Sequence, residues 1–468
     1  MCIVFQGAIA AASVFASVVP ALAQPESNVK NLRPDRGSQQ TVTVPEIAGT
    51  KCQKVGALRT AKSVKFQCVK SAKGLRWVIT TPKSTPITTT TTTTTTMTTT
   101  TTTTTIPQVK FATDPRVTPA KNLSGASDCK MPDVTRWMGQ NTSSGFPRSE
   151  WRPSSKETLK VFVLPITFTD MPFRDYDLQQ LTSSVTTVNK YFQSVSYGKA
   201  DVEFKFAEKS DWINLGRKAD DYGLITGPHT LDKTNLIKEV LSMTSPSLKL
   251  GEYGAVAIQT GYDSRNYFGQ GFILDPETAF KTPSGNVMSA VFDGGWNAGG
   301  WNALAHELGH GWLGFEDLYY FGSNDSFFGR WDLMNGANLP GVELAAWHRF
   351  LVGWIDDSQI RCVPKGSGTT THFISALTAK NDLPKAVTHL ISNGQMLLVE
   401  SRRAGGFDTA GSVTVVYVVD TNIPHSQAPF RLVGELTRIG DKVAFAGAVV
   451  ELVDTDKDGD LVLFTAKN

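Results

Sequence analysis

Apolar and polar residues recur with different periods along the chain, and the period predicts the local structure. Residues 160–168 form an almost continuous apolar run rich in branched side chains, which is typical of a buried strand, and residues 255–259 and 287–292 show the same pattern. Residues 176–195 instead repeat their apolar side chains with helical spacing. We therefore predict a mixed α/β region over residues 108–360.

The last part of the chain has a third pattern. Beyond Cys362, short apolar runs at residues 395–400, 412–419 and 448–453 are separated by turn residues. This punctuation predicts a small β-rich domain, a sandwich, over residues 361–468. Residues 454–460 carry Asp at alternate positions and a Gly, like the start of a calcium loop, but Thr465 stands where such a loop has Glu. We expect a tight β-turn there, with at most weak Ca²⁺ binding.

The N-terminal segments differ in composition from the rest. An apolar run that ends in Ala21-Leu22-Ala23 predicts a signal peptide over residues 1–23, although no Lys or Arg precedes it. Residues 49–80 are too few to bury much core, so we predict a small module held by a disulfide. Residues 81–107 are dominated by Thr and bordered by Pro, which predicts an extended linker.

Composition and cysteine usage narrow the class of protein. The net charge of +3 and the charged fraction of 19% argue against a nucleic-acid-binding surface. The predicted signal peptide indicates an exported protein, secreted or held at the cell surface. No later segment has the apolar length of a membrane span, so we expect nothing after cleavage to hold the chain in a bilayer. Four cysteines remain after the predicted cleavage, and we expect the pairs Cys52–Cys68 and Cys129–Cys362. A latency switch, in which the Cys129 thiolate caps a metal, is the alternative that we favour less.

The segment 301–312 carries the chemistry. His306 and His310 are four residues apart, so a helix places both imidazoles on one face, where they can hold one Zn²⁺. Glu307, beside the first His, is placed to accept a proton from a water molecule. The opposite face of the helix is apolar and should pack on the core; it consists of Trp301, Leu304, Ala305, Leu308 and Trp312.

The surrounding motifs resemble a known family. The HELGH string, the following Asp317-Leu318-Tyr319 and the later stretch Trp331–Met334 occur in this order in the immune inhibitor A-like (thuringilysin) metallopeptidases of the metzincin clan, and the likeness extends over roughly residues 159–420. The resemblance implies a metzincin-like α+β catalytic domain and a zinc endopeptidase that cleaves proteins or peptides. It also implies that Met334 forms an apolar floor under the metal.

The resemblance leaves the third ligand open. The family's Gly follows the second His by three residues, whereas Gly314 follows His310 by four. Counting from Gly314 selects Asp317, which we prefer, and counting from His310 selects Glu316. Tyr319 is a candidate for stabilising an oxyanion, although a packing role accounts for it equally well.

Two other functions remain open. The chain could be an adhesive surface protein with a degenerate peptidase domain, although the intact Glu307 argues against this. It could also be a zinc hydrolase that acts on a non-peptide bond. Zinc content and cleavage of an unfolded protein separate these hypotheses.

Overall fold

The computed structural model of the 468-residue chain describes residues 51, 54–55, 57–61, 64–71, 74–79, 109–132, 141–227, 232–261, 268–294, 300–320, 327–336, 343–424 and 427–466. The predicted signal peptide, the linker and Cys52 lie outside these residues. The chain divides into two compact units, Met1–Thr102 and Thr103–Asn468.

The first unit contains one antiparallel sheet, whose strands β1 (Leu58–Ala61), β2 (Val64–Ser71) and β3 (Gly74–Ile79) pair in that order. Cys68 on β2 is buried and disulfide-bonded. This agrees with a stapled module, and its pairing with Cys52 stays a prediction.

A mixed sheet organises the first half of the second unit. Its order is β5 (Asp201–Phe206), β4 (Thr158–Thr167), β7 (Ala255–Gln259), β11 (Ser289–Gly294) and β8 (Phe268–Ile273). The first four strands are parallel, and β8 runs antiparallel to β11 at the edge. The short strand β6 (Ile213–Asn214) also pairs with β4. The mixed α/β prediction for this region is confirmed.

Both faces of the sheet are buried, which explains the continuous apolar runs. Val161 and Val163 of β4 face the core that includes α1 (Asp175–Val195) and α3 (Trp301–Gly311). Phe162 and Leu164 alternate with them and face a second core with α2 (Thr234–Ser242). The predicted helix at residues 176–195 and the predicted strands at 160–168 and 255–259 thus correspond to α1, β4 and β7.

The predicted strand at residues 287–292 was wrong at its start. Residue 287 ends the hairpin of β9 (Phe280–Thr282) and β10 (Gly285–Val287), and β11 begins only at residue 289. The side chain of Met288 between them is 38% exposed, so the two strands do not form one buried run.

Two sheets form the C-terminal part of the unit. One has the order β12 (Ile360–Val363), β14 (Ala386–Ser392), β15 (Gln395–Arg402), β16 (Val413–Asp420) and β17 (Phe430–Leu436); the other has β13 (Gly368–Ser375), β20 (Gly459–Ala466), β19 (Ala448–Thr455) and β18 (Lys442–Phe445). Apolar side chains of both sheets share one core. The predicted β-rich sandwich is therefore present.

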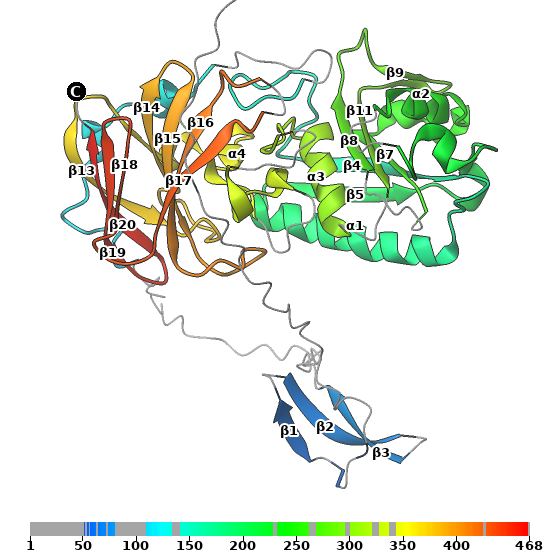
Figure 1. Cartoon of the computed structure of the whole chain (residues 1–468), viewed down its shortest axis with the longest axis horizontal. Helices are drawn as coiled ribbons and strands as arrows, with labels where there is room; N and C mark the ends of the chain where they lie inside the picture. The colour runs from blue at the N-terminus through cyan, green and yellow to red at the C-terminus, as the bar shows by residue number, and fades with distance from the viewer. Residues whose placement is uncertain are drawn as a thin grey trace, which may run out of the picture. The chain divides into compact units, whose positions relative to one another are not determined.

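The sandwich is packed against the region before it. The short helix α4 (Ala346–Leu351) lies between the sandwich and the mixed sheet with its helices (Figure 1), and one apolar core contains residues from α1, α3, α4, β15 and β16. The predicted disulfide Cys129–Cys362 is confirmed, with 6.0 Å between its Cα atoms. Because Cys129 is bonded and fully buried, the latency-switch hypothesis is wrong.

The acidic turn at residues 454–460 joins β19 to β20. Asp456 accepts hydrogen bonds from the backbone N–H groups of Asp458 and Gly459 at 2.8 and 3.1 Å. Asp460 is buried and pairs with Arg403 at 2.5 Å. These carboxylates are engaged within the protein, as expected for the tight β-turn that the sequence favours over a calcium loop.

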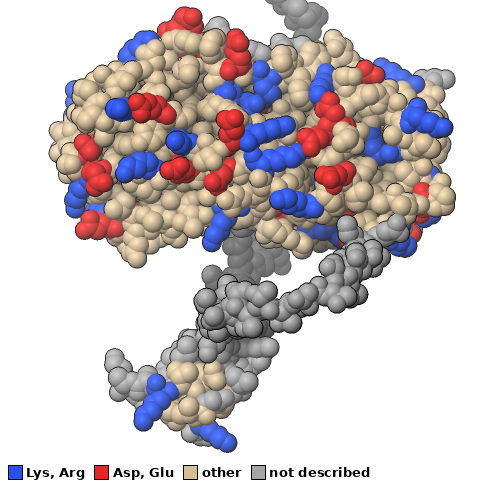
Figure 2. Space-filling model, turned by 180° about the vertical axis from the view of Figure 1, so that it is seen from behind, with Lys and Arg blue, Asp and Glu red and all other residues tan. Residues whose placement is uncertain are grey.

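The surface carries both signs of charge. On the face in Figure 2, acidic and basic side chains of the second unit are interspersed, and neither sign covers the face. Within the described ranges, no helix is both long and apolar enough to cross a membrane.

Candidate metal centre

Helix α3 carries the two predicted histidines, and its apolar face fixes its orientation. Leu304, Ala305, Leu308 and Trp312 lie in the main core, as the spacing predicts. Trp301 is partly buried at the edge of this core. The packed face leaves His306 and His310 on the other side of the helix.

The helix lies unusually close to the edge of the sheet. A methyl group on Gly271 of β8 would come within 2.5 Å of the Glu307 carbonyl oxygen and 2.7 Å of the His310 Cβ. A methyl group on Gly311 would likewise meet Val291 of β11 at 2.6 Å. Two glycines therefore allow the backbone contact that sets the depth of the helix.

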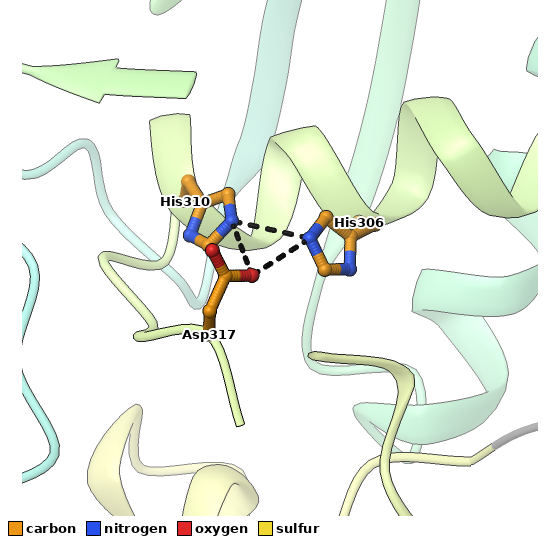
Figure 3. Close-up of side chains that lie close together, drawn as sticks. All are labelled: His306, His310 and Asp317. Atoms are coloured by element: carbon orange, nitrogen blue, oxygen red, sulfur yellow. Dashed lines mark hydrogen bonds and ion pairs between the residues drawn. The ribbon is translucent and has the colours of Figure 1, made fainter. Parts of the chain in front are cut away.

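Three side chains converge beside this helix (Figure 3). The Asp317 Oδ1 atom lies 3.1 Å from His306 Nε2 and 3.2 Å from His310 Nε2, and the two Nε2 atoms are 3.2 Å apart. Three ligands of a tetrahedral ion bound at about 2.0 Å would be separated by about 3.3 Å. The triangle therefore has the size and the N, N, O donor set of a zinc site. These three residues are, among those described, the group able to hold a metal ion.

The other nitrogen of each imidazole is fixed by the backbone. His306 Nδ1 donates to the Leu333 carbonyl oxygen at 3.1 Å, and His310 Nδ1 donates to the Phe315 carbonyl oxygen at 2.7 Å. Because the Nδ1 atom of each histidine carries the donated proton, the Nε2 lone pairs of His306 and His310 point towards each other and towards the Asp317 carboxylate. Such outer bonds orient imidazole ligands and fix their tautomer.

The pKa shifts of His310 and Asp317 indicate that these side chains favour a positive charge between them. Burial alone would lower the pKa of His310, but the neighbouring Asp317 carboxylate outweighs burial and raises that pKa to about 9. Burial would raise the pKa of Asp317, yet His310 and His306 hold it well below its usual range. The three lone-pair atoms therefore need a proton or a cation between them.

The structure favours Asp317 over Glu316 as the third ligand. Glu316 is buried but does not belong to the group that converges with the histidines. Glu307, the predicted base, also lies outside that group and is 3% exposed, next to the first ligand on the helix. The role of Glu307 as a base stays a prediction.

Tyr319 and Met334 lie where the sequence suggests. The Tyr319 ring stacks on His306 with centroids 6.3 Å apart. Burial, followed by the Asp317 and Glu307 carboxylates, raises the pKa of Tyr319 well above its ordinary value, so the phenol keeps its proton. Met334 lies in the short helix Leu333–Asn335, close under Gly309 of α3. The catalytic role of Tyr319 stays a prediction.

Sequence reasoning missed a buried carboxyl group near the base. Asp293 is the penultimate residue of β11 and pairs in register with Gln259 of β7. Burial and the Glu307 charge raise the pKa of Asp293 well above its ordinary value, which favours its neutral form. An acidic residue near the end of a buried strand, just before a glycine-rich segment, was the available signal.

Comparison with known proteins adds no identification: no protein-family model matches this chain, and no curated protein is significantly similar to it. The resemblance to the immune inhibitor A-like family therefore stays a prediction that rests on the motifs themselves.

Proposed function

We propose that this chain is an exported, zinc-dependent endopeptidase with His306, His310 and Asp317 as metal ligands and Glu307 as general base. The observation that carries the proposal is the convergence of two Nε2 atoms from α3 and one carboxylate oxygen from the chain after it, all within 3.2 Å of each other. The same helix carries the buried Glu307. Two nitrogen donors and one carboxylate suit zinc, whereas calcium and magnesium prefer sites made of oxygen atoms.

The residues divide the chemistry between them. Bound zinc would supply Lewis acidity, which acidifies a water molecule and polarises the scissile carbonyl. Glu307 would take the proton of the attacking water and pass it to the leaving amine nitrogen. The carbonyl groups of Leu333 and Phe315 hold the two imidazoles in the orientation that this chemistry needs.

The edge of the sheet supports a peptide as substrate. β8 is the last strand of the mixed sheet, pairing with β11 on one side, and it contacts α3 directly at Gly271. An edge strand can bind an extended peptide through main-chain hydrogen bonds. A substrate strand along β8 would therefore run beside the helix that holds the metal ligands.

Export is part of the same proposal. The disulfide Cys129–Cys362 closes a loop of 233 residues and is buried. Such bonds persist mainly in oxidising compartments outside the cytosol. The apolar run at the N-terminus, read as a signal peptide, agrees with this location.

The test uses the purified chain beginning after residue 23. We expect about one zinc per molecule and cleavage of casein. Glu307→Gln should keep the zinc and lose cleavage, whereas Asp317→Ala should lose both, so the pair separates the base from the ligand. A metal-loaded wild type that cleaves none of several unfolded proteins would exclude the peptidase and leave a hydrolase of other bonds or an adhesive protein.

A further inference from the structure

The fully buried carboxylate of Asp332 caps the short helix Leu333–Asn335, which contains Met334. Asp332 Oδ1 accepts the backbone N–H of Met334 at 2.8 Å. Its Oδ2 atom accepts the backbone N–H of Ala345 at 2.7 Å and the Nδ1–H of His348 at 2.8 Å. Asp332 and His348 are both 0% exposed, so the hydrogen bond between them is shielded from water.

The His348 ring also supports the other side of the site. It stacks on Phe315, with centroids 4.1 Å apart and planes 17° apart, and packs against Phe430 of β17 on the sandwich. The carbonyl group of Phe315 is the acceptor for His310 Nδ1. His348 thus contacts the residue that orients one metal ligand.

The Asp332 side reaches the other two ligands. The carbonyl group of Leu333, next to Asp332 in the chain, orients His306. The Met334 carbonyl accepts the backbone N–H of Leu318, the residue after Asp317, at 2.9 Å. His306 and Asp317 are therefore connected by backbone hydrogen bonds to the turn that Asp332 holds. His310 is connected through Phe315 to the His348 ring that stacks on it.

We propose that Asp332 and His348 act together as the positioning pair of the metal centre, fixing the two backbone segments that orient His306, His310 and Asp317. Neither side chain touches the metal position. Outer partners of metal ligands typically change metal affinity by about 10–100-fold when they are lost. The inference rests on the proposed zinc site, and it does not depend on which bond the enzyme cleaves.

The observations distinguish positioning from general core packing. A purely structural pair would change the stability of the fold without a directed effect on the ligands; in the described part of the chain, the buried pair of Arg403 and Asp460 in the sandwich makes no hydrogen bond or ion pair with the three candidate ligands. One oxygen of Asp332 instead accepts the Met334 N–H in the turn beside His306, and the other accepts the Ala345 N–H at the start of α4. Metal affinity per folded molecule is therefore the quantity that separates the two roles.

The experiment compares zinc affinity in matched variants of the full mature chain, by competition with a chromophoric chelator. His348→Phe keeps an aromatic ring against Phe315 but removes the donor to Asp332, and we expect zinc affinity to fall by about 10–100-fold. His348→Asn restores an N–H donor close to the position of Nδ1 and should recover at least half of that loss on a logarithmic scale. The control is His372→Phe, the same substitution at a 0% exposed His of β13, which should lower stability and leave zinc affinity unchanged.

Each outcome decides the matter. Equal zinc affinity in wild type and a folded His348→Phe would overturn the inference, as would an equal loss in His372→Phe. If His348→Phe does not fold, Asp332→Asn, which keeps the size of the side chain, must show the same loss of affinity. A wild type that binds zinc but cleaves no protein would refute the peptidase and leave this inference standing, whereas a wild type without zinc affinity would refute both.

Discussion

The contact between Gly309 and Met334 makes a quantitative prediction about the floor of the site. A methyl group on Gly309 would overlap the Met334 Sδ atom and lie 3.1 Å from its Cε atom and 3.7 Å from Phe315. In a helix interior, Gly→Ala normally stabilises by about 0.8–1.0 kcal/mol. Overpacking a close contact costs about 1–3 kcal/mol. We therefore expect Gly309→Ala to lower the free energy of unfolding by about 0–2 kcal/mol.

A double-mutant cycle separates the two effects. In a Met334→Ala background the overlap is gone, so adding Gly309→Ala should stabilise by about 1 kcal/mol. Urea unfolding of the wild type, both single variants and the double variant, with a chelator present to remove metal binding, measures the coupling. Gly411→Ala is the control, because a methyl group there meets no atom within 4 Å. If Gly309→Ala stabilised the protein equally in both backgrounds, Met334 would not lie under the helix.

Three further predictions concern acid stability, the extent of the domain and the ligand set. Burial and Arg361 lower the pKa of His372 to about 3, so between pH 6.5 and 3 the unfolded chain binds a proton that the folded chain excludes. The free energy of unfolding should therefore fall as the pH drops from about 6.5 towards 3, by up to about 1.4 kcal/mol per pH unit. His372→Gln should make this slope smaller in acid-unfolding curves. A chain ending at residue 360 lacks Glu400, which accepts the first N–H of α4 at 2.7 Å, and should show neither cooperative unfolding nor zinc binding by calorimetry. Glu316→Gln should keep zinc affinity within about threefold of wild type, whereas Asp317→Asn should lower it at least tenfold in chelator competition.

The elements that the sequence predicted have residues that face a core on one or both sides, although α2 and β20 also face a core and were not predicted. The strands β4 and β7 are buried on both faces, and α1 buries one face, so their patterns were visible in the chain. The helix α3 is buried on all sides, but its apolar residues still recur with helical spacing. The strand β8 was not predicted because Gly269 and Gly271 interrupt its apolar pattern. The close approach of α3 requires a glycine at position 271. The residue that interrupts the apolar pattern of β8 is therefore the one that lets the helix pack against the strand.

The prediction of the site was limited in the same way by long-range contacts. The histidines and Glu307 share a helix, and their geometry follows from its period. Asp332 and His348 are 16 residues apart, and their pairing depends on α4 packing between the sandwich and the sheet. The hydrophobic periodicity around Asp332 or around His348 does not indicate that these two residues are in contact.

The end of α3 bears on the choice between Asp317 and Glu316 as the third candidate ligand. In a Schellman ending, the outer hydrogen bond spans five residues and the inner one three. Here the Phe315 N–H reaches the Gly309 carbonyl over six residues, and the Gly314 N–H reaches His310 over four. Each bond is one residue longer, while Gly314 keeps the left-handed conformation of such an ending, with φ of 66°. The end of α3 is therefore one residue wider than a Schellman ending, while Gly314 still provides the left-handed turn from which the chain runs to Asp317. Counting from the turn is then the physically sound rule, and this is why Asp317, and not Glu316, meets the two imidazoles.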